Sequence, residues 1–140
     1  MTLLELTKAV EGVAKMQQAV KMIVSEDIFR LSNEMSAKYG VFAWTQGAHS
    51  VDVESGMAIY TLTLFYVDRL LDDKSNAVEL HSVGVETLAN IVRGVVETGS
   101  AWVDTALNFT TFSQRFADEC AGVFATVQFK TYQNSICVEN

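Results

Sequence analysis

Residues 56–73 read GMAIYTLTLFYVDRLLDD, and this run sets the requirements for the rest of the chain. Most of its side chains are aromatic, β-branched or leucine, and the threonines between them also favour a strand. Large apolar groups fall on both faces of such a strand: Tyr60, Leu62, Leu64 and Tyr66 on one, Ile59, Phe65 and Val67 on the other. A strand that is apolar on both faces must be covered on both. We therefore predict a long central strand with a helix on one face, and a second helix or a neighbouring subunit on the other.

A polar exit loop follows this strand, from Asp68 to Asn76. Asn76 and Glu79 have the spacing of a capping box at a helix N-terminus. Asp72 and Asp73 stand just before that helix, where the helix dipole favours negative charge.

The composition is that of a folded chain with an acidic second half. The 140 residues suggest a single domain, 1–140, and 49% apolar with 19% charged residues excludes a disordered chain. The net charge is −7, and residues 51–140 supply all of it, with twelve acids and five bases. Because phosphate binding draws on clustered Lys and Arg, the charge disfavours a protein that grips nucleic acid. We expect one end or face of the molecule to be electronegative.

Cysteine usage and hydropathy give little sign of secretion or membrane insertion. Cys120 and Cys137 lack zinc-site spacing, and two cysteines do not make a disulfide scaffold. Buried thiols are the favoured interpretation, and a bridge between the two stays open. Lys8, Lys15 and Lys21 interrupt the apolar positions near the start, so we expect no signal peptide there, and no run is long enough to span a bilayer. We expect a soluble chain assembled inside the cell.

Periodicity predicts two helices and about five strands. The capping box of Thr2 and Glu5 opens the first helix, and a polar loop is expected at 46–57. In chain order the predicted elements are a helix at 2–24, strands at 27–34, 38–46 and 56–73, a helix at 77–97, and strands at 107–116 and 121–132. This order, helix–three strands–helix–two strands, predicts an α+β two-layer sandwich with a mainly antiparallel sheet.

The helix at 77–97 has features that indicate how it packs. Gly84 and Gly94 lower its propensity by roughly 1 kcal/mol each, so we expect them to mark close contacts. Gly99 is a natural stop. Its apolar stripe is Val78, Val85, Leu88, Ile91, Val92 and Val95.

Candidate catalytic and metal-binding residues do not form a recognisable constellation. His81 lies beside the stripe of the second helix, which favours a partly buried structural role, and His49 has no carboxylate or cysteine at ligand spacing. A calcium loop starting at Asp72 would need glycine and glutamate where Ala77 and Val83 stand. No nucleophile elbow, Walker loop, dinucleotide fingerprint or H-E-x-x-H occurs. We predict a protein that is not an enzyme and holds no cofactor or metal.

Four segments resemble a known family. They are YGVFAWTQGAH (39–49), YTLTLFYVDRLLDDKSN (60–76), ELHSVGVETLANIVRGV (79–95) and FTTFSQRFADECAGVFATVQF (109–129). Together they are similar to small tail and neck ring proteins of Bacteroides phages and prophages, including crAss-like phages, over about residues 27–132. The resemblance implies a tail-terminator-like or head–tail connector fold, whose subunits form a ring that continues the DNA conduit. It implies no catalytic residue.

The resemblance and the central strand lead to one functional expectation. We expect a virion structural protein, at the tail or head–tail junction, that is assembled in the host cytoplasm. Its expected partners are copies of itself, neighbouring portal, tail or collar proteins, and passing DNA bound without sequence specificity, with no membrane. Arg69, Asp72 and Asp73 are the candidate interface residues, since an arginine beside acids often pairs across an interface.

Two other functions remain open from the sequence. A non-catalytic small-molecule-binding α+β domain would have a concave apolar pocket between helix and sheet. A metal-dependent enzyme using Asp68, Asp72 or Asp118 is the third hypothesis, ranked below the other two.

Overall fold

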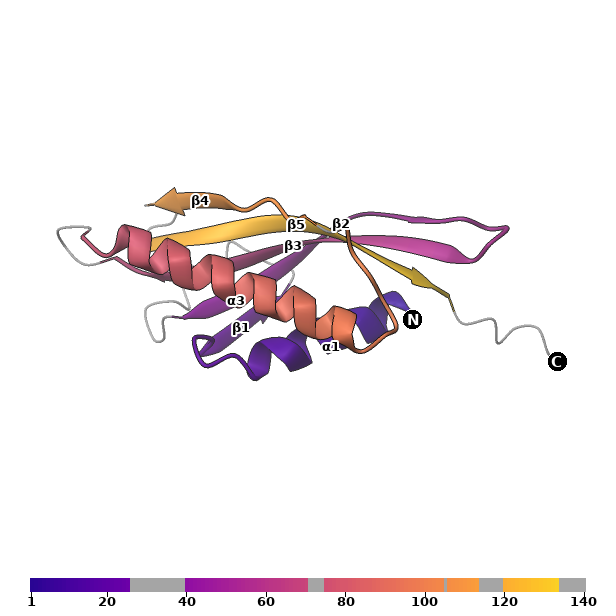
Figure 1. The fold of residues 1–140 in the computed structure, drawn as a ribbon, viewed down its shortest axis with the longest axis horizontal. Helices are drawn as coiled ribbons and strands as arrows, with labels where there is room; N and C mark the ends of the chain where they lie inside the picture. Colours follow the sequence, from indigo (N-terminus) through magenta and orange to yellow (C-terminus); the bar gives the residue numbers. More distant parts are fainter. Residues whose placement is uncertain (26–39, 71–74, 105, 114–119, 134–140) are drawn as a thin grey trace.

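The computed structural model describes residues 1–25, 40–70, 75–104, 106–113 and 120–133, and all structural statements below concern these residues. The element order is α1 (Leu3–Lys15), β1 (Met22–Ser25), β2 (Val41–Val51), β3 (Met57–Arg69), α3 (Ala77–Glu97), β4 (Thr110–Ser113) and β5 (Cys120–Tyr132). The strands form one open, mixed sheet in the order β1-β2-β3-β5-β4. The β1–β2 pair is parallel and the others are antiparallel. The chain is therefore an α+β protein, and both helices lie against the same face of its sheet (Figure 1).

The central strand is confirmed as the middle of the sheet. β3 pairs along its whole length with β5, from Met57 opposite Tyr132 to Arg69 opposite Cys120. On its helix-covered face the apolar side chains are buried: Ala58, Tyr60, Leu62, Leu64 and Tyr66. They form the main core with the buried residues of α1 and α3.

The first helix is shorter than the sequence predicts. Its capping box of Thr2 and Glu5 is confirmed, but α1 ends at Lys15 instead of continuing to residue 24. The Gln17 side-chain amide donates to the Val13 carbonyl and closes the last turn. Residues 22–25, MIVS, then form β1, because they pair with β2 and β-branched residues suit that pairing. Tertiary pairing overrides the helical spacing of this segment.

The predicted extent of the polar loop, 46–57, is wrong. β2 continues to Val51, and only the residues between Val51 and Met57 form the turn of a long hairpin. The Asp52 carboxylate accepts hydrogen bonds from the backbone N–H groups of Glu54 and Ser55. Gly56 closes the turn with a φ of +76°, which glycine adopts without strain. Polar residues here belong to an exposed hairpin and not to a loop.

The second helix has the predicted bounds, 77–97, and its glycines lie at close contacts as expected. A Cβ on Gly84 would lie 2.7 Å from Val123 Cγ2, and one on Gly94 would lie 2.6 Å from Val13 Cγ1. The first glycine lets α3 approach β5 and the second lets it approach α1. Gly99, with a φ of +82°, follows the helix end.

Two details of this helix differ from the prediction. Asn76 makes no side-chain capping bond, and its side-chain amide N–H donates to the Arg69 carbonyl. Val78 is 79% exposed and does not join the buried stripe. The predicted strand at 121–132 is confirmed as β5, whereas β4 covers only Thr110–Ser113 of the strand predicted at 107–116. The strand predicted at 27–34 and Cys137 lie outside the described residues.

Candidate subunit interfaces

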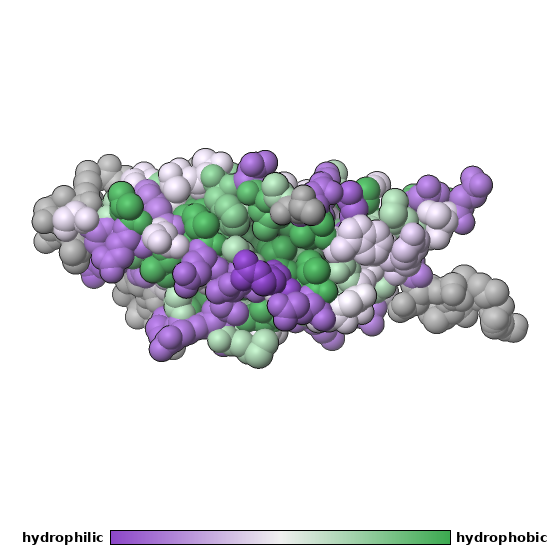
Figure 2. Space-filling view, viewed as in Figure 1, coloured by the Kyte–Doolittle hydropathy of each residue, from purple (hydrophilic) through white to green (hydrophobic). Residues whose placement is uncertain are grey.

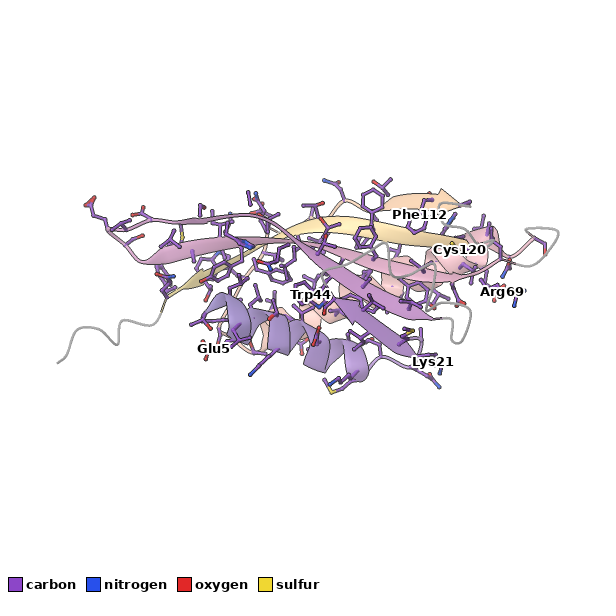
Figure 3. The ribbon with its side chains drawn as sticks, turned by 180° about the vertical axis from the view of Figure 1, so that it is seen from behind. Glu5, Lys21, Trp44, Arg69, Phe112 and Cys120 are labelled. Carbon is purple, nitrogen blue, oxygen red and sulfur yellow. The ribbon has the colours of Figure 1, made fainter. Side chains whose placement is uncertain are left out.

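The second face of the sheet changes character along β3. Near the C-terminal end of β3, Phe65 and Val67 are buried, in a smaller cluster that includes Phe112. Figure 3, seen from behind, shows Phe112, Cys120 and Arg69 at this same end of the sheet. Towards the other end, Ile59 is half-buried, and the Thr63 hydroxyl is hydrogen-bonded to that of Thr126. The prediction of two apolar faces thus holds for one half of the strand.

The β2–β3 hairpin projects from the body of the molecule (Figure 1). We call residues 51–55 the hairpin tip. Val53 is 94% exposed there and Val51 is 41% exposed. The acidic residues Asp52 and Glu54 flank Val53 on both sides. The tip therefore presents an apolar side chain within a negatively charged turn.

A second exposed apolar pair joins the segment after α3 to β5. Trp102 and Tyr132 are 39% and 56% exposed, and their ring centroids are 5.6 Å apart. Trp102 exchanges two backbone hydrogen bonds with Lys130. The Lys130 ammonium also forms an ion pair of 3.1 Å with Asp104. These contacts hold the chain between α3 and β4 against the edge of β5.

An apolar groove lies along the flank of α3. Its volume is about 410 Å³. We call it the α3 groove; its lining is Ala89, Val92, Arg93, Val96, Val103, Asp104, Leu107 and Phe109. Figure 2 shows apolar residues gathered in the middle of this side of the molecule, with hydrophilic residues bordering them. Arg93 stands at the rim, and its guanidinium donates to the Asn90 side chain at 2.8 Å.

A more polar hollow of about 560 Å³ lies between the two helices and the end of β3. Its lining is Gln17, Gln18, Ala19, Lys21, Gly40, Tyr66, Asp68, Val83, Glu86, Thr87 and Asn90. The Tyr66 hydroxyl donates to the Asp68 carboxylate at 3.0 Å. Burial raises the pKa of Tyr66 far above its usual value, and the charge and hydrogen bond of Asp68 raise that pKa further. The neutral phenol is therefore a stable hydrogen-bond donor in this hollow.

This raised pKa predicts a loss of stability at alkaline pH. The contribution of Tyr66 to the free energy of unfolding is fully present below the pKa of its phenol in the unfolded chain, about 10. This contribution is lost as the pH rises towards the higher pKa of the folded state. Between about pH 8 and about pH 11, urea unfolding should show a larger drop in the free energy of unfolding for the wild type than for Tyr66→Phe. Equal losses in the two proteins would contradict the assignment.

Both histidines have structural contacts. The His81 ring is half-buried, as the sequence suggests, and it lies 3.1 Å from the Phe112 carbonyl and so joins α3 to β4. His49 Nδ1 accepts from the Thr61 backbone N–H at 3.2 Å, and Nε2 lies 2.9 Å from the Gln46 side-chain oxygen. With Nδ1 accepting, Nε2 is the nitrogen that donates. His49 therefore joins β2 to β3 within the hairpin.

The candidate interface residues from the sequence are only partly placed. Arg69 is exposed at the last position of β3, beside Asp68, whose carboxylate accepts its backbone N–H. Asp72, Asp73 and Asp118 lie outside the described residues. Within the described ranges, no group of three or more His, Cys, Asp or Glu could hold a metal ion. In the same ranges, no helix is long and apolar enough to cross a membrane.

Sequence reasoning missed the hairpin tip and the α3 groove. The sequence predicts a loop where the tip lies, and the groove combines α3 with side chains of the segment that follows it, among them Val103, Leu107 and Phe109. One sequence feature points to the groove. Val85 and Val96 make the apolar stripe of α3 wider than packing against the sheet alone requires. A scan against protein-family models finds no match to this chain, and a search of curated proteins finds none either.

Proposed function

We propose that this chain is a structural subunit of a phage virion that assembles into a ring at the head–tail connector or along the tail. The single observation that carries the proposal is that one small chain exposes two different apolar surfaces, the hairpin tip and the α3 groove. A ring of identical subunits needs two different surfaces that match each other. The family resemblance of the sequence supplies the virion context, including a tail-terminator-like fold.

The charge of α3 supports a position along a DNA conduit. Its exposed side carries Glu79, Glu86 and Glu97, and Arg93 is its only Lys or Arg. A wall lined with such acids repels phosphates, so DNA slides past without being held. We expect the partners in the virion to be copies of this chain and the neighbouring portal, tail or collar proteins.

The test of this function is the assembly state of the purified protein. We expect mass photometry and negative-stain images at rising concentration to show closed rings. Monomers at every concentration, together with failure to bind neighbouring virion proteins, would refute the proposal.

The polar hollow favours a second function, binding of a small molecule. Tyr66, Asp68 and Thr87 offer hydroxyl and carboxylate groups there, so the ligand would be polar and not the apolar one that the sequence suggests. A thermal-shift screen of polar metabolites tests this function. Stabilisation of the wild type that is lost in Asp68→Asn would support it, and a screen without any shift would count against it.

A further inference from the structure

We propose that the hairpin tip of one copy inserts Val53 into the α3 groove of the next copy, with Glu54 facing Arg93. This inference rests on the proposed ring and names the surfaces that form it. The occupant of the groove is thus a second copy of this chain.

The tip is preformed for such an insertion. Besides the two bonds to the Asp52 carboxylate, the Asp52 backbone N–H donates to the Met57 carbonyl, and the Gly56 N–H donates to the Asp52 carbonyl, both at 2.8 Å. The turn is therefore already in one conformation before it meets a partner. A rigid loop loses less conformational entropy on binding than a flexible one. Within the tip, Val53 is 94% exposed, so it is the side chain whose burial in a partner would remove the most apolar surface from water.

The α3 groove offers an apolar surface whose lining holds two charged residues, Arg93 and Asp104, and Asp104 is already paired with Lys130. Val92 and Val96 of α3 form one wall, and Leu107 and Phe109 form the other. Arg93 uses one of its guanidinium nitrogens for Asn90. A guanidinium has five N–H donors, so others remain to meet a carboxylate. The groove can therefore accept an aliphatic side chain and an adjacent acid together.

Arg93 on the groove is complementary to the acidic tip, because the acid of the lining, Asp104, is paired with Lys130. The only charged side chains of the tip are the acids Asp52 and Glu54. Asp52 is engaged within the turn, so Glu54 is the acid offered to a partner. Arg93 is the one strongly basic residue of α3, and it borders the groove. Opposite charges at matching places set the register of an interface and hasten its formation.

The contact is heterologous, because tip and groove are different surfaces of the same chain. Each copy uses its tip on one neighbour and its groove on the other. Such a contact continues from copy to copy until the rotation between subunits closes a ring. A variant without a working tip and a variant without a working groove can therefore make only one contact with each other. Their mixture should form a complex of two copies that does not grow.

This expectation defines the experiment. Val53→Asp blocks the tip, and Ala89→Glu places a negative charge in the groove. Val78→Asp is the matched control for the first variant, since it changes another exposed valine away from the tip. Ser82→Glu is the control for the second, because it adds the same charge to an exposed position of α3 outside the groove lining. Association is followed by sedimentation velocity and mass photometry.

We expect each blocked variant alone to associate at least about tenfold more weakly than the wild type. An equimolar mixture of the two should form a complex of two copies that grows no further. Both controls should assemble as the wild type does. If the wild type forms rings and the blocked variants form them equally well, the inference is overturned and the proposed function stands. If the wild type forms no ring and binds no virion protein, the proposed function itself fails.

A charge-reversal series covers the case in which Ala89→Glu does not fold. Glu54→Arg and Arg93→Glu alter only exposed side chains. Each reversal alone should weaken association, and the double variant should recover part of the loss. Additive losses in the double variant would overturn the pairing of Glu54 with Arg93.

Discussion

Replacing Gly122 with alanine is expected to lower the free energy of unfolding by about 3 kcal/mol. Gly122 lies in β5, opposite Val67 of β3 and Phe112 of β4. A Cβ at this position would collide with the backbone carbonyl oxygen of Tyr66 and would lie 2.6 Å from Phe112 Cζ. The carbonyl cannot move without disturbing the β3–β5 pairing, so the sheet itself must shift.

The matched control is Gly12→Ala, on the exposed side of α1. A Cβ there would meet no atom within 4 Å apart from its chain neighbours and the nearby backbone of α1 itself. Alanine is a better helix former than glycine, so this variant should be more stable by about 0.5–1 kcal/mol. Urea unfolding of both variants measures the two effects. A loss at Gly122 of less than about 1 kcal/mol would mean that β3 and β5 are not packed as described.

Truncating Phe65 to alanine is expected to destabilise the protein by about 3–5 kcal/mol. Phe65 is 6% exposed on the face of the sheet opposite the helices. Its ring centroid lies 5.7 Å from that of Phe124, and the two rings pack with Phe112. Removal of the ring leaves a cavity among these side chains, which adds to the lost burial.

The matched comparison is Ile59→Ala, on the same face of the same strand. Ile59 is only half-buried, so its truncation should lower the free energy of unfolding by about 1 kcal/mol. Urea unfolding of the two variants at low protein concentration compares them in the monomer. Equal losses of free energy of unfolding in the two variants would mean that this face is buried along the whole of β3. That result would contradict the division of β3 into a buried half and an open half.

The elements predicted best are those whose pattern agrees with their packing. α3 has the predicted bounds because a 3.6-residue apolar stripe runs through it and Gly99 ends it. β5 matches its prediction to within one residue because Val123, Ala125, Val127 and Phe129 recur at every second position and all four are buried, while Thr126, Gln128 and Lys130 alternate with the last three. In both elements local preference and tertiary contact favour the same conformation.

The errors arise where a distant partner decides the conformation. Residues 22–25 continue the apolar spacing of α1, but pairing with Val41 to Trp44 makes them a strand. Residues 46–51, QGAHSV, are exposed and lack a large apolar pattern, yet they form a strand because β3 supplies a pairing partner. Asn76 has the spacing of a cap but makes no capping bond, and its side-chain amide joins the helix start to the Arg69 carbonyl at the end of β3. Sequence spacing contains no information about these partners.

The candidate site was reached only in part from the sequence. The apolar faces of β3 predict a subunit interface, and Arg69 is a candidate for it because an arginine beside acids often pairs across an interface. The sequence does not predict the hairpin tip or the α3 groove, since the groove depends on how Val103, Leu107 and Phe109 lie beside α3.

The amino-acid sequence alone determined the α+β class, the central position of β3 and the two glycines at which α3 packs closely. These follow from side-chain periodicity and from the absence of a Cβ, which are local properties. The tertiary structure alone decided where α1 ends, how far the hairpin extends and which side chains surround the groove. Those features depend on pairing and packing between residues far apart in the chain, whose free energy no local pattern records.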